Sequence, residues 1–149
     1  MKLFLSIVLL SLPALAGVIR VPSQQPTIQA GIAAAATGDT VLVDAGSYVE
    51  NIDFLGKAIT VRSQSDDPEL CVVNSGGPEQ APRCGFWFPP GHGPETVLQS
   101  IAFTCGPDSH GTGVHCYSSP TIANCVFSGN RDDWGAGACC RGGSPTFIG

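Results

Sequence analysis

Short apolar runs alternate with turn-forming residues along most of the chain after residue 17. Valine, isoleucine and aromatic residues are frequent in these runs, and glycine, proline, asparagine and aspartate separate them, which is typical of short β-strands. No Asn-Gly or Asp-Gly dipeptide marks a tight hairpin turn. The pattern therefore predicts a coil of short strands, over residues 18–22, 41–43, 49–54, 58–61, 71–73, 85–88, 96–104, 113–117 and 121–128.

One segment after residue 17 has the apolar spacing of a helix. Ile28, Ile32 and Ala35 or Ala36 fall on one helical face, at i, i+4 and i+7 or i+8. Thr27 is a suitable N-cap residue, and Gly38 stands where a C-terminal glycine is common. We predict a short helix over residues 27–36 that covers the first turn of the coil, because an open end exposes apolar side chains and unpaired strand edges.

The first sixteen residues have the layout of a secretory signal peptide. Lys2 gives a positive start, residues 3–12 form an apolar run, and Ala14, Leu15 and Ala16 match an A-x-A cleavage pattern. The run is too short to span a bilayer, and no later run reaches membrane length. We expect cleavage near Ala16 and a secreted protein, in the extracellular, periplasmic or cell-surface sense, whose domain covers residues 17–149.

Internal repeats set the expected architecture. Residues 111–116 match residues 135–140, and residues 100–104 match residues 124–128, both with a shift of 24; residues 119–122 match residues 144–147 with a shift of 25. A unit of this size cannot bury an apolar face alone, whereas stacked units give every strand a partner. The period predicts a parallel β-helix in which Phe103 lies against Phe127, Ile101 against Cys125 and Cys116 against Cys140.

The segment after the signal peptide resembles the N-terminal cap and first turn of secreted right-handed parallel β-helix proteins of the pectin lyase-like superfamily. The segments that carry this resemblance are Thr27-Ile28-Gln29-Ala30, Gly38-Asp39-Thr40-Val41, Gly46-Ser47-Tyr48-Val49-Glu50-Asn51-Ile52, Gly56-Lys57-Ala58-Ile59-Thr60-Val61 and, as the repeat turn, Ser119-Pro120-Thr121-Ile122-Ala123-Asn124-Cys125-Val126-Phe127. It implies an all-β fold, a single-stranded right-handed solenoid with a capping α-helix. The cap would span residues 18–40, and about five turns would follow over residues 41–149. The repeat is interrupted at Gly149, so we expect a truncated coil or a partner that covers its open end.

Composition removes several classes of function. Only 13% of the residues are charged and the net charge is −5, which disfavours a nucleic-acid-binding protein. Hydrophobic residues make up 43%, which disfavours a disordered chain. The 19 glycines and 12 prolines disfavour a helical bundle.

The best local cluster for ligand binding is Arg131, Asp132, Asp133 and Trp134, with Arg141 one repeat later. Carboxylates and arginine suit sugar hydroxyls, and Trp134 suits a sugar face, so the cluster is a candidate carbohydrate subsite. A solvated turn between repeats explains the same residues and is the favoured interpretation. Trp87 lies between Phe86 and Phe88, so strand alternation directs at least one of these rings outward, where it could bind sugar or lie under a loop.

Two enzyme groups share the resemblance to this cap. Pectin methylesterases use two Asp, a Gln and an Arg on later motifs, and no Gln-Asp-Thr or Asp-Phe-Ile-Phe segment is present. Pectate lyases use acidic residues that bind Ca²⁺ and a basic residue that removes a proton. We therefore favour a non-catalytic module that binds polysaccharide or a cell-surface glycan, or serves as a structural spacer. The alternative is a polysaccharide-processing lyase or esterase with most of its active site missing; Ca²⁺ is expected only under the lyase alternative, and no other cofactor is expected.

Seven cysteines leave at least one thiol unpaired if the others form disulfides. Cys71 with Cys84, and Cys105 with Cys116, are candidate bridges, and the repeat register favours an inward, apolar role for Cys125. His115-Cys116 and Cys139-Cys140 lie one repeat apart, but the C-x₂₋₄-C spacing of zinc sites is absent. A metal site is therefore disfavoured.

Overall fold

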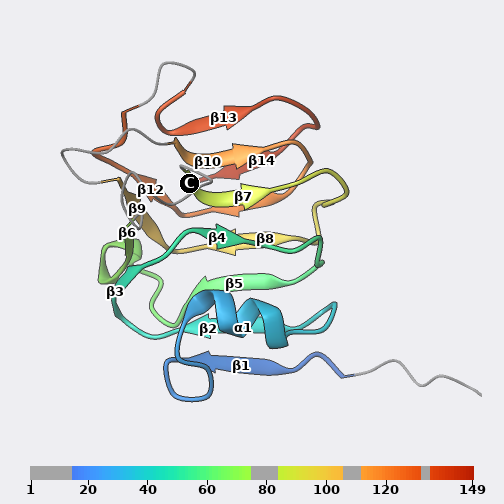
Figure 1. The fold of residues 1–149 in the computed structure, drawn as a ribbon, viewed down its shortest axis with the longest axis vertical. Helices are drawn as coiled ribbons and strands as arrows, with labels where there is room; N and C mark the ends of the chain where they lie inside the picture. Colours follow the sequence, from blue (N-terminus) through green and yellow to red (C-terminus); the bar gives the residue numbers. More distant parts are fainter. Residues whose placement is uncertain (1–14, 75–83, 106–111, 132–134) are drawn as a thin grey trace, which may run out of the picture.

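The computed structural model of the chain describes residues 15–74, 84–105, 112–131 and 135–149, and its strands form three parallel sheets (Figure 1). Sheet A contains β1 (Val18–Val21), β2 (Thr40–Val43), β5 (Thr60–Ser63), β8 (Val97–Gln99), β11 (Thr121–Ala123) and β14 (Thr146–Ile148). Sheet B contains β3 (Gly46–Val49), β6 (Cys71–Asn74), β9 (Ala102–Thr104) and β12 (Val126–Phe127). Sheet C contains β4 (Ile52–Asp53), β7 (Cys84–Phe88), β10 (Thr112–Cys116) and β13 (Ala138–Cys140). The helices are α1 (Ile28–Ala34) and the 3₁₀ turn η1 (Pro68–Leu70).

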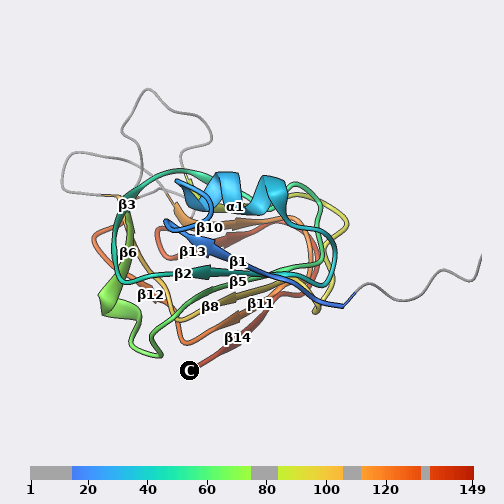
Figure 2. The ribbon, with the colours of Figure 1, turned by 90° about the horizontal axis from the view of Figure 1, so that it is seen from below.

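The chain visits the sheets in the order A, B, C and then returns to A one level higher. The view along the long axis shows the strands of each sheet stacked over one another (Figure 2). From β2 onward, each circuit of the chain supplies one strand to every sheet, whereas β1 is followed by α1 and then by β2 of the same sheet. The architecture is all-β, with parallel sheets and one α-helix, and is consistent with the predicted parallel β-solenoid.

Strand register confirms the repeat read from the sequence. Phe103 pairs with Phe127, Cys116 pairs with Cys140, and Thr121 pairs with Thr146. The period is not uniform in the earlier turns, because Thr60 pairs with Thr40, 20 residues before it, and with Val97, 37 residues after it. The sheets hold the strands in register while the connections between them change length.

Three predicted strands are wrong in extent, since each divides into two strands in different sheets. The segment over residues 96–104 separates into β8 and β9 at Ser100, and that over residues 121–128 separates into β11 and β12 at Asn124. Both residues adopt left-handed backbone conformations, with φ of 54° and 49°. At each of these two places, a single left-handed residue that is not a glycine turns the chain from sheet A into sheet B. The third segment, residues 49–54, separates into the end of β3 and β4.

Helix α1 begins as predicted, since the Thr27 hydroxyl accepts a hydrogen bond from the Ala30 N–H at 3.0 Å. The predicted end at residue 36, with Gly38 as the terminating glycine, is wrong: the helix ends at Ala34, and Ala35 is already extended. Lys57 closes the helix instead, because its Nζ donates to three carbonyl oxygens at its end, those of Ile32, Ala33 and Ala35, at 2.7–2.8 Å. The helix packs against β1, β2 and β4, at the end of sheet C where a further strand would lie (Figures 1 and 2).

Aromatic side chains fill the interior between the sheets. Phe54 and Phe88 stack with ring centroids 4.4 Å apart, and Phe86 meets Phe103 edge to face at 6.0 Å. All four rings are fully buried. The Phe103 ring lies against Gly85, where an added Cβ would come within 2.3 Å of it. An added Cβ at Gly113, also in sheet C, would come within 2.5 Å of the Phe127 ring. Gly85 and Gly113, the glycine column, thus make room for the rings carried by sheet B.

Candidate binding surface on sheet A

The residues that carry the family resemblance hold the capping helix in place. Both carboxylate oxygens of Glu50 accept N–H groups at the start of α1, from Ile28 and Gln29, each at 2.9 Å. The Gln29 amide exchanges two hydrogen bonds with the backbone of Asp53. These contacts, with the Lys57 cap, give the motif a structural role and assign it no chemistry.

Asp39 belongs to the same cap. Its carboxylate accepts the N–H groups of Gly17 at 2.6 Å and of Ala36 at 2.9 Å. Hydrogen bonds from the Ala36 and Gly17 backbone hold the pKa of Asp39 below its usual value, since they stabilise the charged form. The carboxylate is thereby engaged with the chain itself and fixes the approach to β2.

Only the two arginines of the cluster predicted as a carbohydrate subsite lie within the described residues. Arg131 is exposed directly before the next undescribed segment, and Asp132, Asp133 and Trp134 lie outside the described residues. Arg141 is exposed, and hydrogen bonds from its guanidinium to the side chains of Cys139 and Tyr117 raise its pKa. The subsite at residues 131–134 remains a prediction.

Aromatic rings gather on the outer face of sheet C. Trp87 is half-buried and meets His115 and Tyr117 edge to face, with centroids 5.0 and 5.5 Å apart. The His115 and Tyr117 rings stack at 5.2 Å. The predicted alternation is confirmed, because Phe86 and Phe88 point into the core while Trp87 points outward. Ring contacts with its neighbours occupy part of the Trp87 side chain.

Most of the described cysteines are buried. Cys71 and Cys116 carry free thiols, so the candidate bridges Cys71–Cys84 and Cys105–Cys116 are wrong. Burial raises the pKa of the Cys71 and Cys125 thiols to about 11 each, which keeps both protonated and unreactive at neutral pH. Cys125 is partly buried and packs against the core, as its repeat position predicts.

Strand alternation separates the two histidine–cysteine pairs that the repeat brings together. His115 lies beside Cys139 on the outer face of sheet C, whereas Cys116 lies beside Cys140 on the inner face. The four side chains therefore cannot converge on one ion. Within the described residues, no group of three or more His, Cys, Asp or Glu is placed to hold a metal.

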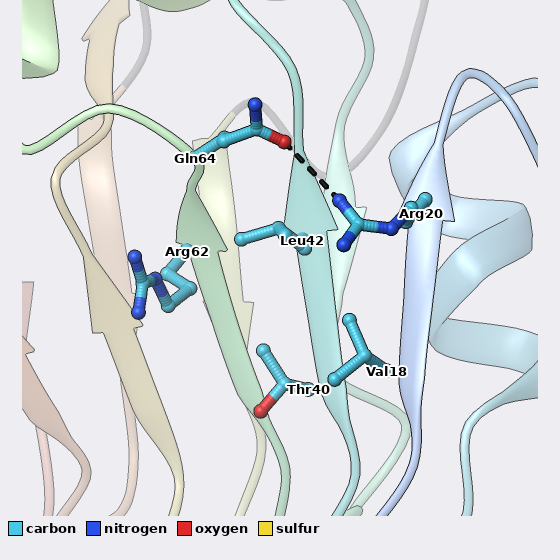
Figure 3. A pocket seen from close by; sticks show the side chains of 6 residues that line it. All are labelled: Val18, Arg20, Thr40, Leu42, Arg62 and Gln64. Atoms are coloured by element: carbon cyan, nitrogen blue, oxygen red, sulfur yellow. Dashed lines mark hydrogen bonds between the residues drawn. The ribbon is translucent and has the colours of Figure 1, made fainter.

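The outer face of sheet A carries an open depression of about 390 Å³ (Figure 3). Its lining comes from alternate positions of β1, β2 and β5 and from the residue directly after β5: Val18, Arg20, Thr40, Leu42, Arg62 and Gln64. The intervening side chains of these strands, such as Val41 and Val61, are fully buried in the core. The register places Arg20, Leu42 and Arg62 in one row across the sheet, so two guanidinium groups flank an apolar side chain.

Arg20 and Arg62 each donate a hydrogen bond to an uncharged oxygen, which orients the guanidinium group and leaves its positive charge without a carboxylate among the lining residues. Arg20 Nη1 donates to Gln64 Oε1 at 3.2 Å (Figure 3), and Arg62 Nε donates to the Ser63 carbonyl at 3.2 Å. A guanidinium has five N–H donors, so each of these bonds orients the group while using one donor. None of the six lining residues is a carboxylate, which makes this face suited to an anionic ligand.

Sequence reasoning missed this surface. The alternation in the segment around Arg20 already directs that side chain away from the core, and the same holds for Arg62. The two residues are 42 positions apart, however, and only the pairing of β1 with β2 and of β2 with β5 brings them into one row.

Comparisons with protein-family models, curated proteins and solved structures give no match to this chain. Among the described helices, none has the length and apolar character needed to cross a membrane. The predicted signal peptide falls almost entirely on residues 1–14, which lie outside the described residues. Secretion therefore stays a prediction.

Proposed function

We propose that this protein is a secreted or cell-surface module, of the right-handed parallel β-helix type found in the pectin lyase-like superfamily, that binds an acidic polysaccharide without transforming it. The observation that carries the proposal is the row of Arg20, Leu42 and Arg62 on the outer face of sheet A, in a depression lined by no carboxylate. This positive surface stands on a chain whose net charge is −5.

The chemistry of the lining fits a uronate chain. Neighbouring strands lie about 4.8 Å apart, so the Cα atoms of Arg20 and Arg62, two strands apart, are separated by roughly 10 Å. Two guanidinium forks at that spacing can each pair with a carboxylate of one extended polymer. The Thr40 hydroxyl and the Gln64 amide suit sugar hydroxyls, and Leu42 offers an apolar contact for the C–H face of a ring.

Affinity gel electrophoresis with polygalacturonate tests the proposal, with dextran as the neutral polymer. We expect retardation by polygalacturonate alone, weakening as salt rises. The pair Arg20→Ala and Arg62→Ala should reduce the affinity at least tenfold. The pair Arg131→Ala and Arg141→Ala removes the same number of positive charges at the other predicted subsite, where both residues are exposed. This pair should leave the affinity unchanged, and a loss of binding in it alone would place the ligand at residues 131–134 and Arg141.

Two other outcomes would redirect the assignment. A folded protein that binds no polyuronate would favour the structural-spacer role. Unsaturated oligogalacturonides formed in the presence of Ca²⁺, or methanol released from methylated pectin, would show that the chain is an enzyme.

A further inference from the structure

Two cysteines are neighbours on the inner side of sheet C, at the end of the sheet formed by β13. Cys116 in β10 and Cys140 in β13 are register partners in adjacent parallel strands. Cys116 is fully buried, whereas Cys140 is exposed because β13 is the outermost strand of the sheet in the structure. One thiol of the pair is therefore accessible to reagents in solution, and its neighbour is sheltered directly behind it.

The spacing of the two residues suits a disulfide. Neighbouring strands are about 4.7–4.9 Å apart, and the Cα atoms of disulfides usually lie about 4.4–6.8 Å apart. The register of β6, β9 and β12 puts Cys71 and Cys125 two strands apart, at roughly 10 Å, which is too far for a bond. Cys139 lies beside His115 and faces outward. Among the described cysteines, the geometry thus distinguishes Cys116 and Cys140.

In the structure, where both cysteines are reduced, the thiol of Cys116 makes a hydrogen bond to Ser118 and not to Cys140. Cys116 Sγ donates to the Ser118 carbonyl at 3.1 Å. Burial raises the pKa of the Cys140 thiol, and the neighbouring Cys116 and Cys139 raise it further, which agrees with the short separation. The Cys116 side chain can therefore lie against Ser118 when reduced and rotate toward Cys140 when oxidised.

We propose that Cys116 and Cys140 form a reversible disulfide that links β10 to β13. A small-molecule disulfide such as oxidised glutathione supplies the oxidant. The exposed Cys140 thiolate attacks one of its sulfurs and releases one glutathione thiolate. The Cys116 thiolate then attacks Cys140 Sγ and releases the second glutathione. The two protein thiols lose two protons and two electrons in total, and the glutathione disulfide is reduced to two thiols.

The bond closes a loop of about 25 residues and fastens β13, which is the edge strand of sheet C among the described strands. In the chain-entropy description, a loop of this length raises the midpoint of thermal unfolding by roughly 10–14 °C. The disulfide would thus make the stability of the β13 end of the molecule depend on redox conditions.

Intact-mass measurement of the full chain, incubated with oxidised glutathione or with dithiothreitol and then alkylated, tests the proposal. The variant Cys139→Ser removes the adjacent thiol, so a bridge to residue 140 can be assigned to one cysteine. Because no Lys or Arg lies between residues 84 and 130, chymotrypsin and Asp-N are used with trypsin to separate Cys116 from Cys84, Cys105 and Cys125. We expect the oxidised variant to lose two hydrogens, to yield a peptide joining Cys116 to Cys140, and to unfold at a higher temperature until dithiothreitol is added. Cys140→Ser, at an exposed position, should fold normally and lose both the cross-link and the shift.

Complete alkylation of every remaining thiol in oxidised, folded Cys139→Ser would overturn the proposal. So would a cross-link from Cys140 to Cys84 or Cys105, or a bond found only between two chains. Cys139 is buried as Cys116 is, so the folding of Cys139→Ser is checked by circular dichroism and the unsubstituted chain is digested and mapped beside it.

Discussion

Lys57→Met removes the ammonium group that ends α1 while keeping most of the apolar side-chain stem. In the structure, this single group donates hydrogen bonds to the carbonyl oxygens of Ile32, Ala33 and Ala35, at 2.8, 2.7 and 2.8 Å. The last carbonyls of a helix have no partner within the helix. Methionine supplies no donor, so the Ala33 and Ala35 oxygens must bind water or remain unsatisfied, and the Ile32 oxygen keeps only the Ala35 N–H, at 3.2 Å.

The expected loss follows from the number of bonds and their exposure. A hydrogen bond to a charged group contributes about 1.5–3 kcal/mol net when it is sheltered, and less when water can replace it. Lys57 is half-buried and Ala33 is exposed, so about 1 kcal/mol for each bond is appropriate. The variant should lose about 2–3 kcal/mol of the free energy of unfolding, which lowers the unfolding midpoint by roughly 8–12 °C for a domain of this size.

Urea unfolding followed by far-ultraviolet circular dichroism measures this loss. Thr27→Ala removes one hydrogen bond at the other end of the same helix and should cost about 1 kcal/mol, which calibrates the measurement. Arg62→Met, a change of a half-buried cation on the outer face of sheet A, should cost less than either. A loss below about 0.5 kcal/mol for Lys57→Met would refute the reasoning, because it would mean that water replaces all three bonds without penalty.

Substitutions in the glycine column and at a buried histidine test the packing of the core. Gly85→Ala and Gly113→Ala should each cost about 1–3 kcal/mol in urea unfolding, since a Cβ at either site overlaps an aromatic ring, whereas Gly137→Ala meets nothing within 4 Å and should be neutral. Burial lowers the pKa of His92 in the folded protein, so the unfolded chain takes up the proton at a higher pH than the folded protein does. The free energy of unfolding should therefore be constant above the unfolded-state pKa of about 6.5 and should fall as the pH drops from there to the folded-state pKa. His92→Asn should flatten this dependence in thermal unfolding series, and an unchanged slope would show that other groups cause it.

The sequence by itself determined the features that depend on local or periodic patterns. The shift of 24 residues gave the pairing of Phe103 with Phe127 and of Cys116 with Cys140, because equivalent residues of stacked repeats occupy equivalent positions. The N-cap at Thr27 was also readable, since a cap depends on residues only three positions apart. The inward and outward positions of each strand followed from alternation.

Other features were decided only by the tertiary structure, because they join residues that no local pattern connects. The end of α1 depends on Lys57, more than twenty positions further along the chain, and so the local glycine signal at Gly38 misplaced it. The left-handed Ser100 and Asn124 divide strands whose apolar runs look continuous in the sequence.

For the candidate surface on sheet A, too, the sequence predicts one part and the tertiary structure decides the other. Alternation places Arg20 and Arg62 outside the core, but the sequence cannot show that they share one row, because the length of each turn varies from 20 to 37 residues between pairing partners. Register is set by the hydrogen bonds and packing of whole sheets, and these long-range contacts decide which outward side chains become neighbours.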